Sequence, residues 1–240
     1  MSGPFLAELL AGLVDRRAAA VLVTGGIGVG KSRACRQAAD SLQRRGMRVG
    51  GIVALRVVAA GETIGYDVVD VASGGHRPLA RRDSFGDQAG RSAQWIGERA
   101  PANSTGHPSG CGAGRPPAPG SGVGRPPAGH VGRFSMMPGG LALARQALGS
   151  AAESARIVFV DEIGPWELQG GGLAEPLRRL LGRPVILTLV VRPALVDRVA
   201  RAFALPGHRL WRIPEAGDSR TPTPARAGTA RRCPRRRLGP

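Results

Sequence analysis

One lysine, Lys31, constrains the fold of this chain more than any other residue. All but one of its 34 Lys and Arg side chains are arginines, and the exception stands in the glycine-rich run GGIGVGKS at residues 25–32. This run fits the phosphate-binding loop pattern G-x-x-x-x-G-K-[ST], in which main-chain amides cradle a polyphosphate and the lysine reaches its outer oxygens. A compact ammonium suits a narrow loop better than a guanidinium does. The run therefore predicts a P-loop fold.

The segments around the loop are typical of an α/β protein. An apolar run at 20–24 meets the glycines as a buried parallel strand would, and a helical stripe of apolar residues covers 31–45. Residues 54–58 and 64–71 flank a turn, which predicts an antiparallel hairpin. Further strands are expected at 47–55, 157–160, 185–191 and 209–213, and helices at 5–14, 141–148, 173–181 and 194–203. We therefore expect a mainly parallel sheet covered by helices on both faces, with an added antiparallel hairpin.

The formal charge of +17 is unevenly distributed along the chain. Residues 99–133 and 218–240 carry +4 and +6 of it, are rich in Gly, Pro and Arg, and lack apolar periodicity. They are predicted to be a disordered insertion and a disordered tail, which leaves 1–98 and 134–217 as a single P-loop domain. That domain carries an ordinary charge for a protein that binds polyphosphate. If the chain binds nucleic acid, it is expected to do so only through these two basic segments. The favoured interpretation of both segments is solvent-exposed chain without a binding function.

Cysteine usage and apolar runs bear on the compartment. Cys35, Cys111 and Cys233 are widely spaced and form no C-x-x-C pair, so no disulfide or zinc framework is expected. This pattern fits a reducing cytoplasm. No apolar run approaches 18 residues and the N-terminus lacks the pattern of a signal peptide, so the sequence predicts no membrane partner. It predicts no particular oligomeric state.

The strand expected at 157–160 runs directly into two acids, Asp161 and Glu162. In a parallel sheet the end of this strand and the glycine-rich loop lie at the same carboxyl edge, where ligands bind. We predict that Ser32 and Asp161 hold Mg²⁺. The nucleotide is predicted to be bound by the loop and the start of its helix, namely Gly25, Gly26, Ile27, Gly28, Val29, Gly30, Lys31, Ser32 and Arg33.

The second acid is free for chemistry, because magnesium needs only one carboxylate here. Glu162 is predicted to orient and deprotonate the water that attacks the γ-phosphate, which favours hydrolysis over phosphoryl transfer to an alcohol. Lys31 and Arg192 are the candidates for meeting the charge that develops in the transition state. Thr188 is either a γ-phosphate sensor or an ordinary strand residue.

Five segments resemble, in this order, the cancer-related nucleoside-triphosphatase family. They are GGIGVGKS at 25–32, GG-x(12)-IGYDVVDV from Gly50, RPLAR at 77–81, VGRF at 131–134 and VFVDEIGPWEL at 158–168. The resemblance implies a RecA-like P-loop fold and Mg²⁺-dependent hydrolysis of ATP, GTP and other nucleoside triphosphates. It also implies nucleotide binding by residues 25–32, with Asp161 and Glu162 at the metal and the water.

The chain departs from the family pattern at one place and leaves a second unexplained. Where the family commonly has a T-E-E-V-R-like stretch, residues 54–58 read ALRVV, which removes two acids and an arginine from their usual positions. Glu167 matches the family's second acid, but its residue type and spacing assign it no role.

Two other functions remain open from the sequence. One is a nucleotide-binding accessory protein with little turnover, which the altered stretch at 54–58 favours. The other is a small-molecule or nucleotide kinase, although no segment has the pattern of an arginine-bearing lid. Since Lys31 is the single lysine, the N-K-x-D motif that reads guanine is absent, and no base preference is predicted.

Overall fold

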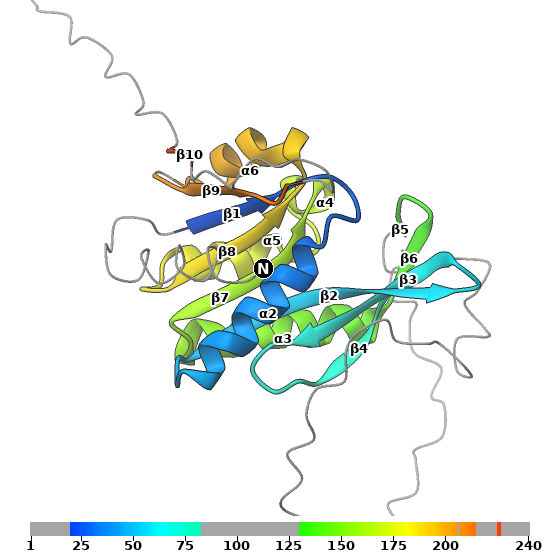
Figure 1. The fold of residues 1–240 in the computed structure, drawn as a ribbon, viewed down its shortest axis with the longest axis horizontal. Helices are drawn as coiled ribbons and strands as arrows, with labels where there is room; N and C mark the ends of the chain where they lie inside the picture. Colours follow the sequence, from blue (N-terminus) through cyan, green and yellow to red (C-terminus); the bar gives the residue numbers. More distant parts are fainter. Residues whose placement is uncertain (1–19, 83–129, 206, 215–224, 227–240) are drawn as a thin grey trace, which may run out of the picture.

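The computed structural model describes residues 20–82, 130–205, 207–214 and 225–226, and these build one mixed sheet (Figure 1). The strand order is β10-β9-β1-β8-β7-β2-β3-β4-β6-β5. The central strands are parallel: β9 (Arg209–Arg212), β1 (Ala20–Thr24), β8 (Ile186–Val191), β7 (Ile157–Ile163) and β2 (Val49–Ala59). Strand β8 lies between β1 and β7, so one strand separates the glycine-rich loop from the two acids.

An antiparallel extension continues the sheet beyond β2. It consists of β3 (Glu62–Asp70), β4 (His76–Arg82), β6 (Phe134–Met136) and β5 (His130–Val131), while β10 (Ala225–Arg226) pairs antiparallel to β9 at the other edge. The predicted second strand and the first arm of the predicted hairpin are a single strand. The first half of β2 pairs with β7 and the second half pairs with β3. The extension is thus larger than the hairpin that the turn residues indicated.

Helices cover both faces of the parallel strands, as the alternating pattern predicted. Val21 and Val23 pack toward α2 (Lys31–Arg44), together with its buried residues Cys35 and Leu42. Leu22 and other residues of the opposite face pack against the remaining helices, which are α3 (Pro138–Ser154), α5 (Ala174–Leu181) and α6 (Val196–Ala202). Two short elements, α4 (Pro165–Leu168) and η2 (Pro193–Leu195), complete the helical content of the described residues. Because β1 is buried on both faces, all five of its residues are apolar or small.

The predicted boundaries hold for most elements and fail where local signals are weak. Helix α3 begins at Pro138 and ends at Ser154, well outside the predicted 141–148, because Pro is favoured in a first helical turn and alanines extend the pattern. The predicted helix 5–14 lies outside the described residues. Of the predicted insertion and tail, the structure describes residues 130–133, in the β5–β6 hairpin, and strand β10. None of the described helices is of a length and apolarity that would cross a bilayer.

Gly51 allows β2 and β7 to lie side by side. Its φ is +95°, and a Cβ placed on it would lie 2.0 Å from the Phe159 carbonyl oxygen. No side chain fits there without displacing main chain. The residue belongs to the Gly-Gly pair that opens the second motif of the sequence, so this motif reflects strand packing next to the acids.

Gly46 ends α2 and provides a measurable test of this termination. Its φ is +75°, nothing lies within 4 Å of a Cβ placed on it, and its N–H donates to Gln43 O at 2.9 Å. Gly46→Ala should therefore cost only the left-handed backbone penalty, about 1 kcal/mol in urea unfolding. Gly149→Ala, within α3 and equally open to a Cβ, is the matched control and should stabilise by about 0.5–1 kcal/mol. Equal effects of the two substitutions would contradict this account.

Candidate functional site

The phosphate-binding loop connects β1 to α2 as its sequence predicted. Gly28 and Gly30 have φ of +81° and +92°, so the loop uses conformations that favour glycine. Gly25 has φ of +151°, and a Cβ there would lie 2.9 Å from the Ile213 carbonyl oxygen at the end of β9. Ile27, at the outer part of the loop, is 93% exposed. The specified glycines are thus required by main-chain geometry, and the variable position between them faces outward.

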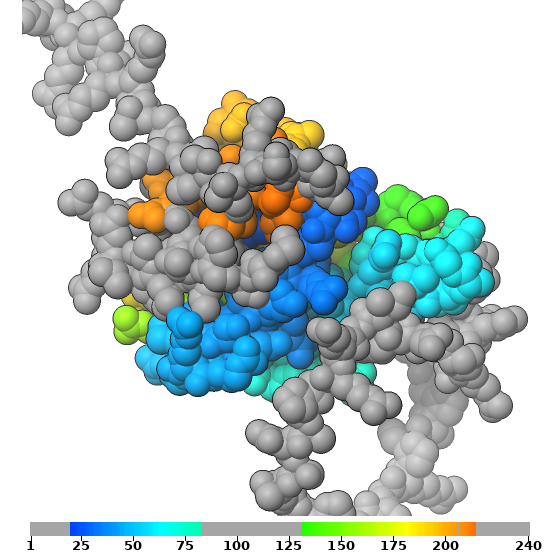
Figure 2. Space-filling model, in the orientation of Figure 1, coloured from blue at the N-terminus to red at the C-terminus, as the bar shows by residue number. Residues whose placement is uncertain are grey.

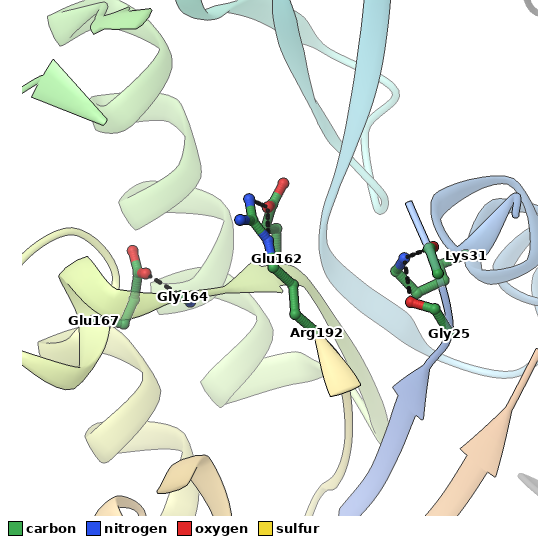
Figure 3. Close-up of polar contacts among 7 residues, drawn as sticks. Gly25, Lys31, Glu162, Gly164, Glu167 and Arg192 are labelled. Atoms are coloured by element: carbon green, nitrogen blue, oxygen red, sulfur yellow. Dashed lines mark hydrogen bonds and ion pairs between the residues drawn. The ribbon is translucent and has the colours of Figure 1, made fainter. Parts of the chain in front are cut away.

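Lys31 is the first residue of α2, and its side chain folds back over the loop. Its Nζ donates to the carbonyl oxygens of Gly25 at 3.0 Å and Gly26 at 2.6 Å (Figure 3). These two acceptors hold the ammonium above the glycine-rich turn. A phosphate oxygen bound by the loop would therefore meet a positive charge that is already positioned.

Asp161 is buried at 4% exposure and lies on the side of the sheet that carries the loop. Its Oδ2 accepts a hydrogen bond of 2.9 Å from the main-chain N–H of Ala54. Burial raises the pKa of Asp161 to about 6, the negative charge of Glu162 also raises it, and the Ser32 hydroxyl, the Ala54 N–H and Lys31 lower it. Ser32 and Lys31 are thus close enough to Asp161 to lower its pKa, so the buried strand acid lies beside the loop.

Glu162 occupies an unusual backbone position next to this buried acid. Its φ is +61°, and the regular pairing of β7 with β8 is interrupted between Val160 and Ile163. A glutamate with this φ is uncommon, and such residues concentrate at functional sites. The interruption leaves Asp161 buried and directs Glu162 to the surface.

Arg192 immediately follows β8 and forms an ion pair with Glu162. Its Nε lies 3.1 Å from Glu162 Oε1, and its Nη2 contacts the same oxygen. Figure 3 shows the two side chains directed toward each other, one from the end of each neighbouring strand. Both remain about half exposed, at 53% and 43%. The structure thus brings together the predicted water-activating acid and the predicted transition-state arginine.

The oxygen ligands available at the loop suit a magnesium ion in chemical type and in number. A carboxylate and a hydroxyl, from Asp161 and Ser32, are hard oxygen ligands of the kind Mg²⁺ prefers when phosphate and water supply the rest. No group of three or more His, Cys, Asp or Glu side chains gathers as a metal cage anywhere in the described residues. A ligand set of this kind would suit an ion that is held jointly with a phosphate chain.

Glu167 has a structural role that the sequence analysis did not assign. It is buried, and its carboxylate accepts hydrogen bonds from the N–H groups of Gly164 at 3.0 Å and Leu173 at 3.4 Å. Burial raises its pKa, and these main-chain hydrogen bonds lower it. Gly164 is the N-cap of α4, Pro165 its first residue and Glu167 its third. That spacing is a helix-start signal, and it could have been recognised in the motif.

Replacing Glu167 should destabilise the segment that follows Asp161 and Glu162, and the loss should grow with the number of hydrogen-bond acceptors that the substitution removes. Glu167→Ala leaves two buried N–H groups without their carboxylate and should cost about 2–3 kcal/mol in urea unfolding. Glu167→Gln keeps one carbonyl acceptor and should cost roughly half as much. If both variants unfold at the same urea concentration as the unmodified protein, the carboxylate does not stabilise this loop.

Thr188 lies in the middle of β8 and away from the carboxyl edge. It pairs with Val21 on one side and Phe159 on the other, and it is fully buried. Its hydroxyl and that of Thr24 are buried side-chain groups with no hydrogen-bond partner. Of the two interpretations of Thr188, an ordinary strand residue agrees with this position.

The fold and the loop are those of P-loop NTPases. Comparisons with known proteins indicate which P-loop NTPases the chain resembles. The sequence model described as NTPase matches residues 20–96. Nucleoside-triphosphatase THEP1 from Methanopyrus kandleri is 24% identical over 159 residues, 66% of this chain and 65% of that protein. THEP1 from Archaeoglobus fulgidus is 28% identical over 186 residues, 76% of this chain and 85% of that protein.

A solved structure agrees with the fold. The solution structure of a human cancer-related nucleoside triphosphatase superposes with a TM-score of 0.50 at 24% identity, covering 84% of this chain and 90% of that chain. The chain is thus similar in sequence to the THEP1 nucleoside-triphosphatases, in agreement with the resemblance that its motifs indicated. It spans just under two thirds of the length of the Methanopyrus relative.

Proposed function

We propose that this protein is a Mg²⁺-dependent nucleoside-triphosphatase that releases phosphate from ATP, GTP and related triphosphates. The observation that carries the proposal is the arrangement of four charged side chains at the loop and at the strand ends beside it. Lys31 is held over the glycine-rich turn, Asp161 is buried beside Ser32, and Glu162 stands one residue further on with Arg192. The names of the related proteins, which are called nucleoside-triphosphatases, support the same conclusion.

The reaction follows from the charges of these groups. Glu162 accepts a proton from a water whose oxygen forms a bond to the γ-phosphorus, while the bond from that phosphorus to the β–γ bridging oxygen breaks. The diphosphate leaves with the bonding electron pair. Lys31 and the loop amides offset its added negative charge, and Arg192 is placed to offset the charge on the transferred group. Phosphoryl transfer to a bound alcohol would instead need an acceptor site.

Magnesium, when bound through Ser32 and Asp161, would neutralise charge on the β- and γ-phosphate oxygens. The chain's own contribution is to hold a carboxylate ready for it. The Ala54 N–H fixes Asp161 at 2.9 Å, so the carboxylate is already oriented before the nucleotide binds. The proposal also includes a cytoplasmic location, which the cysteine pattern supports.

Phosphate release from the four common nucleoside triphosphates, with MgCl₂ or with excess EDTA, tests the proposal directly. We expect turnover with all four that depends on the divalent ion, since the chain lacks the N-K-x-D motif that selects guanine. Tight nucleotide binding without phosphate release would instead support the nucleotide-binding accessory protein. Transfer of phosphate to an added nucleoside would support the kinase.

A further inference from the structure

The antiparallel extension projects past the edge of the sheet at which the acids stand. Pairing of β2 with β7 ends at Ile52 and Val160, yet β2 continues to Ala59 alongside β3. In this projecting part Arg56 pairs with Tyr66, so their side chains lie next to each other on one face. Figure 1 shows the β5–β6 hairpin beside the far end of β3.

Phe134, the first residue of β6, and Arg133, in the turn before it, lie next to this pair. The rings of Tyr66 and Phe134 meet edge to face, with centroids 5.5 Å apart, and Arg133 lies 5.4 Å from the centre of the Phe134 ring. Tyr66 and Phe134 are only partly buried, while Arg56 and Arg133 are exposed. We call Arg56, Tyr66, Arg133 and Phe134 the arginine–aromatic patch.

The Glu162–Arg192 ion pair lies within electrostatic range of Tyr66 in the patch. Burial raises the pKa of Tyr66, the charge of Glu162 also raises it, and Arg56, Arg192 and Arg133 lower it. Tyr66 is therefore within electrostatic range of three guanidinium groups and one carboxylate, and that carboxylate contacts Arg192. The neighbourhood carries excess positive charge next to two aromatic rings. In Figure 2 the blue loop region, the cyan β2–β3 strands and the green β5–β6 hairpin lie next to one another at the surface.

We propose that the arginine–aromatic patch binds a second ligand, a phosphorylated nucleoside unit, separate from the triphosphate on the loop. Arginines bind its phosphate, and the rings offer a surface on which a base can stack. The unit is either a free nucleoside monophosphate or the end of an RNA strand, which share this chemistry. The binding site does not depend on hydrolysis.

Binding of this ligand would act on the catalytic acid, and this consequence rests on the proposed function. A phosphate beside Arg192 competes with Glu162 for the same guanidinium. When Arg192 shares its guanidinium with the ligand, its ion pair with Glu162 weakens and Glu162 is freer to accept a proton from water, while Arg192 stays next to the reacting phosphate. The second ligand should therefore stimulate phosphate release.

Fluorescence anisotropy of a labelled, 5′-phosphorylated RNA hexamer, with the full chain and no triphosphate present, tests the binding site. Arg56→Gln and Arg133→Gln should each weaken binding about tenfold, and Arg56→Lys should restore part of it. The matched control, Arg183→Gln, changes an exposed arginine just before β8 and should leave binding unchanged. All variants keep the basic residues of 99–132 and 218–240, so equal binding by all of them would indicate binding through these segments and would overturn the proposal.

Competition identifies the source of the ligand. Displacement by a nucleoside 5′-monophosphate supports a free nucleotide, whereas displacement by unlabelled RNA alone supports the end of a strand. Equal displacement by inorganic phosphate shows that the rings are not used and overturns the proposal. Phosphate release is then measured with and without the displacing ligand. If the patch variants weaken binding but the protein releases no phosphate, the proposed hydrolase is refuted and the second binding site is still supported. If the protein releases phosphate but the patch variants bind normally, only the second binding site is refuted.

Discussion

Replacing Glu162 by glutamine is expected to lower the rate of phosphate release at least about 100-fold. Glutamine has nearly the same shape, and its carbonyl oxygen can still accept a hydrogen bond from Arg192. It cannot accept a proton from water. Because Glu162 lies on the surface side of β7 and Asp161 retains its place beside Ser32, nucleotide affinity should change by no more than about twofold. Single-turnover phosphate release and nucleotide binding, measured on the same preparations, separate the two effects.

Glu153→Gln provides the matched control for this change. Glu153 is an exposed glutamate in the last turn of α3, and its substitution removes the same charge far from the loop. It should leave turnover unchanged. Equal rates in the unmodified protein and Glu162→Gln would show that Glu162 does not activate water, and the ion pair with Arg192 would then be its only role.

The parallel core of the fold could be predicted because its signals are local and repeated. The first four residues of β1 are apolar since both faces of the strand are covered, and the loop follows it with glycines at the positions that need unusual φ values. The contact between Asp161 and the loop followed from a general property of parallel sheets, whose carboxyl ends meet at one edge. These predictions needed no knowledge of which strand neighbours which.

The antiparallel extension was harder to predict, because its contacts join segments far apart in the chain. Strands β4 and β6 pair although residues 83–133 separate them in the sequence, and neither strand carries a local signal that identifies the other as its partner. The positive φ of Glu162 could not be predicted either, because positive φ values are usually signalled by glycine or asparagine and this residue is a glutamate. The sequence identified Arg192 only by its place after a strand, and its pairing with Glu162 depends on β7 and β8 being neighbours. Glu167 differs from these cases, because the spacing Gly-Pro-x-Glu is a local sequence signal for its capping position.

Asp161→Asn is expected to stabilise the ligand-free protein at neutral pH while it removes the effect of Mg²⁺ and nucleotide. Burial raises the pKa of Asp161 from 3.8 to about 6 in the folded state, so the folded protein binds the proton more tightly than the unfolded chain does. Stability therefore falls as the pH rises from about 4 to 6 and stays lower above that. The penalty is about 3 kcal/mol when fully developed. Asparagine carries no charge, and its carbonyl oxygen can accept the hydrogen bond from Ala54.

Urea unfolding in EDTA at pH 4 and pH 8 measures this effect. The variant and the unmodified protein should differ little at pH 4, where Asp161 is protonated in the folded state, and Asp161→Asn should be the more stable at pH 8. Adding MgCl₂ and a non-hydrolysable triphosphate should stabilise the unmodified protein and leave the variant almost unaffected, because a neutral amide is a poor Mg²⁺ ligand. Asp40→Asn, on the exposed side of α2 where Asp40 contacts Arg36 at 3.1 Å, is the control. If MgCl₂ and the triphosphate stabilise Asp161→Asn as much as they stabilise the unmodified protein, Asp161 does not hold the metal. A carboxylate with a packing role alone would give that result.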